Sequence, residues 1–252
     1  MIEQNYLQPM KLSNTIMNNN AYEIILVGTR KIKNVKCLIT NTIAFCPITH
    51  TLEGIDSLIF TSRYAIQSLL ESASPLSPHY NPHLAKWREI PSFVISPKSA
   101  ELLYKHNARV EFVGQKAHGK EFAKEIIPLL KNHSPLYFRA KEIISHLNTT
   151  LKNAKIPLQE AIAYVNTPLI LEQNLKPKPQ SVLIFTAPSA YKSFVSNFGW
   201  EDEYIAIAIG KSTLSYFDST INAHISPKPS IPHAIKFAKS IALELNTQNA
   251  RK

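Results

Sequence analysis

The sequence contains little glycine and little cysteine, and it has no long apolar run. Its 252 residues include six glycines and two cysteines. So few glycines make a glycine-rich phosphate loop hard to build, and the patterns G-x-x-x-x-G-K-S/T, G-x-G-x-x-G, G-x-S-x-G and H-E-x-x-H are all missing. No apolar stretch approaches the roughly 20 residues that a membrane-spanning helix needs. We therefore expect none of these four kinds of site and no membrane partner.

Cysteine and histidine show no pattern that holds a metal. Cys37 and Cys46 lie nine residues apart without a C-x-x-C motif, which predicts reduced thiols in a reducing compartment. Of the nine histidines, only His79 and His83 have a spacing typical of metal ligands, and both fall in the proline-broken stretch SPLSPHYNPH. We expect no metal and no organic cofactor.

The N-terminal segment 1–20 is rich in asparagine and has no apolar periodicity. It also lacks the charged start and apolar core of a signal peptide. We expect a disordered tail over these residues and a cytoplasmic protein.

Acidic residues are outnumbered, 18 against 28 lysines and arginines, so the net charge is +10. The basic residues are scattered, with small groups at 30–36 and 176–178, whereas nucleic-acid-binding proteins usually concentrate them on one element. We expect no nucleic-acid partner. A polyanionic small molecule remains open as a ligand.

Short apolar runs alternate with amphipathic segments along the chain. We expect strands at 23–27, 42–46, 57–60, 92–95, 109–113, 136–138, 160–165, 181–186, 204–209 and 223–225. We expect helices at 63–72, 98–107, 119–131, 141–153, 189–198, 212–219 and 232–245, with a further short helix between Gly28 and Thr42. This alternation predicts an α/β fold with parallel sheets covered on both faces by helices.

Three motifs occur twice, in the same order. LIFTSRYA (58–65) matches LIFTAPSA (183–190), and ISPKSAEL (95–102) matches IGKSTLSY (209–216). KAHGKEFA at 116 and KPSIPHAI at 228 each precede the last helix of their half. The offsets are 125, 114 and 112 residues, which predicts two similar α/β lobes.

Hydroxyl side chains gather where these motifs leave a strand and enter a helix. Such turns lie at the carboxyl ends of strands, where open α/β sheets bind ligands, and free N–H groups at a helix N-terminus attract anions. The residues concerned are Thr61, Ser62, Ser96, Ser99, Thr186, Ser189, Ser212 and Thr213. Each of them can equally serve only as a helix cap. As two sets in two lobes, they favour a shared anionic ligand in a cleft between the lobes.

Seven motifs of the chain resemble, in the same order, those of the uroporphyrinogen-III synthase family. They are LIFTSRYA, ISPKSAEL, YFRAKE (137–142), AYVNTP (163–168), LIFTAPSA, AIGKSTL and SPKPSIPHA. The resemblance covers roughly residues 23–243. It implies two flavodoxin-like lobes joined by a two-stranded linker. Lobe 1 would comprise 21–47 plus 166–252, and lobe 2 would comprise 48–165.

The resemblance also implies a cytoplasmic, cofactor-independent lyase of haem biosynthesis. Such an enzyme converts hydroxymethylbilane, a linear tetrapyrrole with eight carboxylates, into cyclic uroporphyrinogen III, with the last ring inverted and water released. The chemistry is mainly a matter of positioning, because hydroxymethylbilane also closes spontaneously to the I isomer.

Site residues follow from the resemblance position by position. Tyr164 matches the tyrosine that assists departure of the hydroxyl. Arg139 matches the arginine of an Arg-Gly pair, with Ala140 in place of glycine, and can hold a carboxylate. Ser96 stands where the family has a glycine, and the nearby Lys98 can supply charge instead. Lys211 of AIGKSTL joins the candidate substrate-binding residues. The family's Tyr-x-Thr is one residue longer here, running from Tyr164 to Thr167.

Two other functions stay open at this point. One is a non-catalytic two-lobed protein that binds an acidic metabolite, and the other is a nucleic-acid-associated protein. We expect a monomer, because two lobes of one chain supply both walls of the site.

Overall fold

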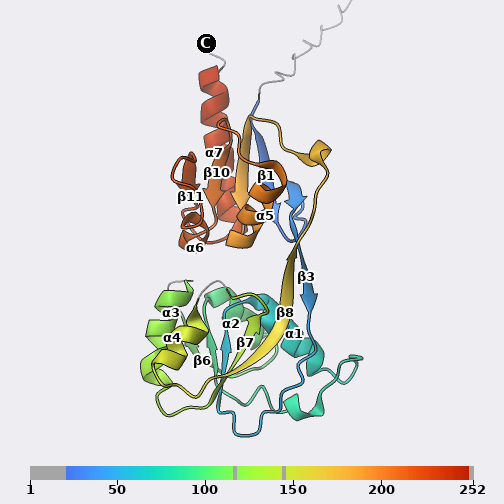
Figure 1. Cartoon of the computed structure of the whole chain (residues 1–252), viewed down its shortest axis with the longest axis vertical. Helices are drawn as coiled ribbons and strands as arrows, with labels where there is room; N and C mark the ends of the chain where they lie inside the picture. The colour runs from blue at the N-terminus through green and yellow to red at the C-terminus, as the bar shows by residue number, and fades with distance from the viewer. Residues whose placement is uncertain (1–20, 116–117, 144–145, 250–252) are drawn as a thin grey trace, which may run out of the picture.

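The chain forms two α/β lobes stacked end to end and joined by a two-stranded ribbon (Figure 1). The computed structural model describes residues 21–115, 118–143 and 146–249. The tail expected over 1–20 lies outside these residues.

One lobe contains a five-stranded sheet, in which every pair of neighbouring strands is parallel, and is here called the five-stranded lobe. Its strands, in sheet order, are β11 (Ala223–Ile225), β10 (Ile205–Ala208), β9 (Ser181–Phe185), β1 (Glu23–Gly28) and β2 (Lys36–Ile39). Its helices are α5 (Pro188–Phe198), α6 (Lys211–Leu214) and α7 (Ile231–Asn249), with a 3-10 turn, η3, at Gln173–Leu175.

The six-stranded lobe contains one antiparallel pair at its edge, β3 with β8, and otherwise parallel neighbours. Its strands, in sheet order, are β3 (Asn41–Phe45), β8 (Gln159–Pro168), β7 (Pro135–Ala140), β4 (Ser57–Phe60), β5 (Ser92–Val94) and β6 (Val110–Val113). Its helices are α1 (Arg63–Ser72), α2 (Pro97–Tyr104), α3 (Gly119–Ile126) and α4 (Leu147–Asn153), with 3-10 turns η1 (Pro82–Leu84) and η2 (Ile127–Leu129).

Strands β3 and β8 also form the ribbon between the lobes (Figure 1). Their register runs from Asn41 opposite Pro168 to Phe45 opposite Tyr164. The expected fold, parallel sheets flanked by helices in two lobes with a two-stranded linker, is confirmed. The residue boundaries expected for the two lobes stay predictions.

The repeated motifs occupy equivalent places in the two sheets. LIFTSRYA contains β4, which is the third strand of its sheet when the strands are counted from β8. LIFTAPSA contains β9, which is the third strand of the other sheet when the strands are counted from β2. Counted in this way, the sheets read β8-β7-β4-β5-β6 and β2-β1-β9-β10-β11. The spatial order is the same, but β1 and β2 precede their lobe's repeat along the chain while β7 and β8 follow theirs. The two lobes are therefore circular permutations of one arrangement.

The apolar run of the repeat is buried on both faces of each sheet. In β9, Leu183 and Phe185 pack on the face covered by α5, while Val182 and Ile184 pack on the face covered by α7. In β4, the side chain of Phe60 contacts the α1 face and that of Ile59 the α3 face. Alternation along a strand sends successive side chains to opposite faces, so a central strand needs a continuous apolar run.

The segment between β1 and β3 differs from expectation. The short helix expected between Gly28 and Thr42 is wrong: residues 29–35 form bends and turns, and residues 36–39 form β2, a strand that was not predicted. Asn34 has a left-handed φ of 61°, and the Ile32 N–H donates to Cys37 Sγ at 3.2 Å. Strand β2 is short and begins with an exposed lysine, so its pattern alone was too weak to show a strand.

Candidate functional site

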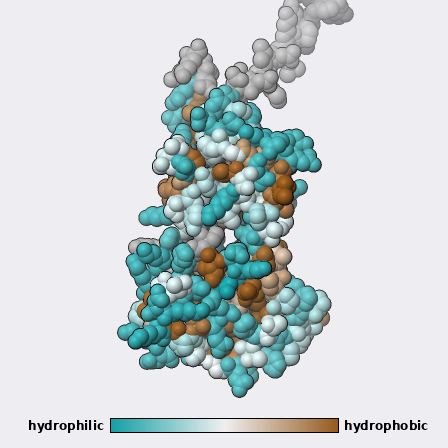
Figure 2. Space-filling view, viewed as in Figure 1, coloured by the Kyte–Doolittle hydropathy of each residue, from teal (hydrophilic) through white to brown (hydrophobic). Residues whose placement is uncertain are grey.

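A cleft of about 1220 Å³ lies between the lobes, and both lobes line it. Its walls come from segments that leave the carboxyl ends of β1, β9 and β10 on one side and of β4, β5 and β7 on the other. The molecular surface narrows at this level (Figure 2). Because parallel strands end at one edge of a sheet, the two permuted sheets bring both of their ligand-binding edges to the same space.

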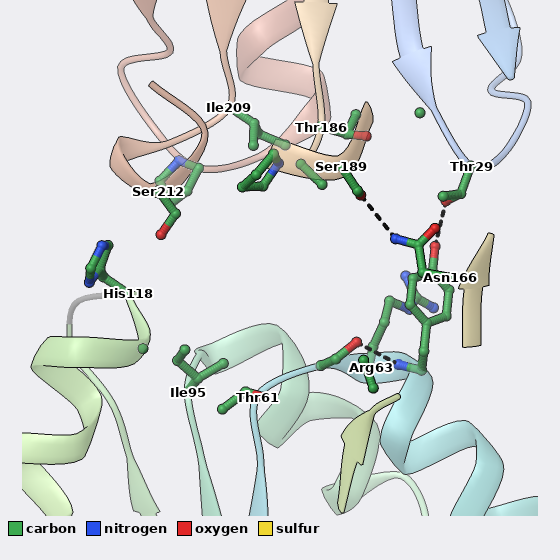
Figure 3. Close-up of a pocket in the computed structure, with 18 of the residues that line it drawn as sticks. Thr29, Thr61, Arg63, Ile95, His118, Asn166, Thr186, Ser189, Ile209 and Ser212 are labelled. Carbon is green, nitrogen blue, oxygen red and sulfur yellow. Dashed lines mark hydrogen bonds between the residues drawn. The ribbon is translucent and has the colours of Figure 1, made fainter. Parts of the chain in front are cut away.

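Seven of the twelve predicted site residues line this cleft. From the six-stranded lobe and the ribbon these are Thr61, Ser62, Lys98 and Tyr164, and from the five-stranded lobe they are Thr186, Ser189 and Ser212. In the close-up, Thr186, Ser189 and Ser212 lie on one wall, with Thr61 and Arg63 on the other (Figure 3). The structure therefore brings together hydroxyls that are more than 120 residues apart in the sequence.

The other five predicted residues are not among the lining residues. Thr213 and Ser99 are buried, at 2% and 4% exposure. Ser96 caps α2, and its Oγ lies 3.2 Å from Ser99 Oγ. Lys211 is exposed at the first position of α6. Arg139 is engaged by Glu160, as described below. A substrate-binding role for each of these five stays a prediction.

Side chains cap α1 and α2 of the six-stranded lobe but not α5 and α6 of the five-stranded lobe. Ser62 accepts from the Tyr64 N–H at the start of α1, and Ser96 accepts from the Ser99 N–H at the start of α2. Helices α5 and α6 have Ala187 and Gly210 at the N-cap, without a side-chain cap bond. Of the eight hydroxyl residues expected at N-cap positions, only Ser62 and Ser96 occupy them. The uncapped N-terminus of α5 lies in the cleft wall, where an anion would be favoured.

Tyr164 lies on β8 where the ribbon passes the cleft. Burial raises the pKa of its phenol above the ordinary value of 10; a hydrogen bond to Ser62 opposes this rise, and the charge interaction with Tyr64 adds to it. The phenol is therefore protonated throughout the neutral range and can act as a proton or hydrogen-bond donor.

Two hydrogen bonds join the five-stranded lobe to Tyr64 and Asn166, which lie near Tyr164. Thr29 Oγ1 lies 2.7 Å from Tyr64 Oη, and Asn166 Nδ2 donates to Ser189 Oγ at 2.9 Å (Figure 3). The ring of Tyr64 contacts that of Tyr164, with centroids 5.6 Å apart. Asn166 follows Tyr164 by two residues on the same strand and lines the cleft with it.

The charges around the cleft favour an anionic ligand. Its described lining includes five basic side chains, Arg30, Arg63, Lys98, Lys105 and Lys120, against two carboxylates, Glu101 and Glu142. His118 and His146 also line it. Opposite charge around a concave surface raises the local concentration of a charged ligand. Within the described ranges, no group of three or more His, Cys, Asp or Glu side chains is arranged to hold a metal ion.

Arg139 belongs to a charge cluster centred on Glu160. Its Nε donates to Glu160 Oε2 at 2.5 Å, and its Nη1 donates to the carbonyls of Ala140 and Lys141. Lys152 pairs with the other oxygen of Glu160, whose side chain is 12% exposed. Burial alone would raise the pKa of Glu160, but hydrogen bonds and charge from Lys152 and Arg139 outweigh it, so the pKa lies below 4.5. The guanidinium is thus already paired with a carboxylate of the protein.

Glu160→Gln is expected to lower the free energy of unfolding at pH 7 by about 2 kcal/mol, the scale of hydrogen bonds to a charged group. Because the folded pKa is depressed, the stabilisation is present above the unfolded value near 4.5 and is lost as the pH falls through the folded value. Urea unfolding between pH 3 and 7 measures this stabilisation. The free energy of unfolding should fall less steeply with decreasing pH in the variant than in the wild type. The control Glu111→Gln removes an exposed pair with Arg109 and should change stability by less than about 1 kcal/mol. Equal stability of wild type and Glu160→Gln would contradict the prediction.

Several lining residues were not predicted, among them Thr29, Arg63, Tyr64 and Asn166. Arg63 and Tyr64 directly follow Thr61 and Ser62 in LIFTSRYA, so their position next to the site was available from the motif. Asn166 lies in the lengthened segment after Tyr164. Thr29 had no signal, because the permuted order that places the end of β1 at the cleft is visible only in the folded sheet.

Within the described part of the chain, no helix is both long enough and apolar enough to span a bilayer.

Comparison with known proteins identifies the family. The family model described as "Uroporphyrinogen-III synthase HemD" matches residues 30–236. The crystal structure of uroporphyrinogen-III synthetase from Helicobacter pylori is 36% identical with a TM-score of 0.71, covering 87% of this chain and 99% of that one. A mutant uroporphyrinogen III synthase from Thermus thermophilus is 14% identical with a TM-score of 0.63, covering 89% and 99%, and supports the fold alone. No curated protein matches. The chain therefore belongs to the uroporphyrinogen-III synthase family, whose members are cyclising lyases of tetrapyrrole biosynthesis.

Proposed function

We propose that this chain binds hydroxymethylbilane in the cleft between its lobes and converts it into uroporphyrinogen III, with Tyr164 as the catalytic residue. The observation that carries the proposal is the position of Tyr164: a phenol with a raised pKa lies in the wall of a cleft lined by basic side chains and hydroxyls from both lobes. A linear substrate with eight carboxylates matches that charge.

Tyr164 donates its hydrogen bond, and then its proton, to the terminal hydroxyl of the substrate. The carbon–oxygen bond breaks and water leaves, while the pyrrole N–H of the same ring gives up a proton that restores the phenol. The resulting azafulvene is attacked by the substituted carbon of the last ring, which forms a spiro intermediate. The older bond to that carbon then breaks, and the ring recloses through its free carbon in the inverted orientation; the proton that this carbon loses replaces the N–H proton given up in the first step.

The remaining task of the protein is to make inversion faster than direct closure. Each tenfold preference for isomer III requires only about 1.4 kcal/mol of differential stabilisation. Fixed contacts to the carboxylates on both walls can supply this by holding the last ring over the reacting carbon. The proposed contacts are Thr61, Ser62 and Lys98 on one wall and Thr186, Ser189 and Ser212 on the other. Five further residues support these walls or bind substrate after small rearrangements of the protein: Ser96, Ser99, Arg139, Lys211 and Thr213.

We also propose that the protein acts as a cytoplasmic monomer with no nucleic-acid partner. One chain supplies both walls of the cleft, which supports the monomer. Sedimentation at micromolar concentration tests the oligomeric state, and a dimer mass would overturn that part of the proposal.

The test of the function is a product assay. Purified protein is mixed with hydroxymethylbilane generated in situ, the products are oxidised, and uroporphyrins III and I are separated by chromatography. We expect a large excess of isomer III over the no-enzyme control. A ratio equal to the control, from protein with a cooperative unfolding transition, would overturn catalysis. Binding without turnover would then favour a carrier of an acidic metabolite.

Removing the hydroxyl of Ser189 should weaken substrate binding. Ser189→Ala deletes a cleft hydroxyl at the uncapped start of α5, together with the hydrogen bond that it accepts from Asn166, and we expect KM to rise about fivefold, the factor that one hydrogen bond of ordinary net strength represents. Steady-state kinetics of III formation measures it. Ser196→Ala is the matched control, because it makes the same change at an exposed position of the same helix outside the cleft. An unchanged KM in Ser189→Ala would exclude a binding role for this hydroxyl.

A further inference from the structure

The phenol of Tyr64 links the two lobes at the point where Tyr164 lies. Tyr64 is the second residue of α1 in the six-stranded lobe, and its N–H donates to the capping Oγ of Ser62 at 3.1 Å. Its Oη lies 2.7 Å from Oγ1 of Thr29, which follows β1 in the five-stranded lobe. The backbone of Tyr64 is therefore held by one lobe and its hydroxyl by the other.

The ring of Tyr64 also packs against the ring of Tyr164. The centroids are 5.6 Å apart and the planes are inclined by 58°, a tilted arrangement within the range of attractive aromatic pairs. Tyr64 and Tyr164 are both only half-buried and both line the cleft. A tyrosine on the wall of an open cleft has room to rotate, so a neighbour with a fixed ring limits the directions in which its hydroxyl can point.

A second hydrogen bond joins the strand that carries Tyr164 to the five-stranded lobe. Asn166, two residues further along β8, donates to Ser189 of the five-stranded lobe at 2.9 Å. Its Oδ1 is buried and has no hydrogen-bond partner among the described residues, whereas its amide nitrogen is held by Ser189. The strand that carries Tyr164 is thus attached to the five-stranded lobe directly after the tyrosine, while its ring is supported through Tyr64.

We propose that Tyr64 is a positioning residue: anchored by Thr29 across the cleft, it holds the Tyr164 ring in the orientation that delivers the proton. This proposal rests on the catalytic role proposed for Tyr164. The orientation of Tyr164 then depends on the relative position of the lobes, because separation of the lobes withdraws Thr29 and releases the Tyr64 hydroxyl. Proton delivery is thereby restricted to molecules whose two lobes lie close enough to form the hydrogen bond between Thr29 and Tyr64.

The test is a double-mutant cycle. Tyr64→Phe keeps the ring and removes the hydroxyl, and Thr29→Val keeps the shape and removes the partner. For each variant, kcat, KM and the ratio of isomer III to isomer I are measured. We expect each single variant to lower kcat about fivefold with a smaller change in KM, and the double variant to be no slower than either. The III to I ratio should fall together with kcat, and Thr29→Ser should restore both.

Controls separate positioning from general damage to the fold. Tyr104→Phe changes a tyrosine that is 56% exposed on α2 and outside the cleft lining, and it should leave kcat and the isomer ratio unchanged. Thermal unfolding of every variant should occur within a few degrees of the wild type, because no core side chain is lost.

Three outcomes would overturn the inference. The first is a Tyr64→Phe variant that keeps the wild-type kcat and isomer ratio while Tyr164→Phe is impaired. That result would exclude a role for Tyr64 in the mechanism, but it would not contradict the proposed function. Single effects that multiply in the double variant would show that Thr29 and Tyr64 act separately. A fully active Tyr164→Phe would remove the catalytic role on which the inference rests.

Discussion

Replacing Tyr164 with phenylalanine is expected to lower kcat by about 100-fold, the lower end of what a positioned proton donor contributes. The ring stays in place against Tyr64, so the change removes the donor and little else. The fold should persist with a similar midpoint of unfolding. Initial rates of uroporphyrinogen III formation at saturating substrate measure the loss, and the residual product should contain a larger share of isomer I.

The pH dependence gives a second readout of the same residue. The phenol acts while protonated, and burial places its pKa above 10, so Tyr164 imposes no loss of activity between about pH 6 and 9. If the activity of the wild type falls only above pH 10, and this fall is absent in Tyr164→Phe, the result supports Tyr164 as the proton donor. Tyr80→Phe is the control, because Tyr80 is 41% exposed and lies outside the cleft lining. Full activity of Tyr164→Phe would exclude a required phenol.

Phe185→Ala should destabilise the five-stranded lobe by about 4 kcal/mol, within the range for removing a buried phenylalanine. Phe185 is fully buried, and its ring contacts those of Tyr191, Phe194, Trp200 and Phe217 at centroid distances of 5.4 to 6.3 Å. Small shifts of its neighbours cannot fill the space left by one ring that touches four others. Urea unfolding followed by circular dichroism measures the change.

The exposed residue Leu243 offers a comparison for Phe185. It is 69% exposed on α7, and Leu243→Ala should alter stability by no more than about 0.5 kcal/mol. If Phe185→Ala lost no more than Leu243→Ala, the aromatic cluster would not hold the lobe together. Near-ultraviolet circular dichroism should also change in Phe185→Ala, because Trp200 loses a neighbouring ring.

The central strands were predictable because their patterns have a single physical meaning. The runs containing Leu58 to Phe60 and Leu183 to Phe185 are buried on both faces, and a continuous apolar run between two turns suits a parallel strand covered by helices. The hydroxyl turns after them were predictable for the same reason, since the end of a parallel strand is also the start of a helix connection.

Other features depend on contacts that no local pattern shows. Strand β2 is held by its pairing with β1, so four residues beginning with an exposed lysine could not be recognised alone. The pairing of Arg139 with Glu160 joins residues 21 apart on neighbouring strands. Thr29 reaches the cleft because of sheet order, and it meets Tyr64 because the ribbon sets the two lobes face to face.

The permuted strand order has a consequence for how the chain folds. Strands β4, β5, β6 and β7 follow one another, so the core of the six-stranded lobe can assemble as soon as they are made. The pairing of β1 with β9, in which Glu23 lies opposite Ser181, must wait until β9 is made, and it closes a loop of nearly 160 residues. Hydrogen-exchange labelling during refolding should therefore protect β4 and β7 before β1 and β9. During synthesis β1 can pair with β2 at once, but its other neighbour, β9, is made only after the six-stranded lobe, so one edge of this buried strand stays unpaired while that whole lobe is translated.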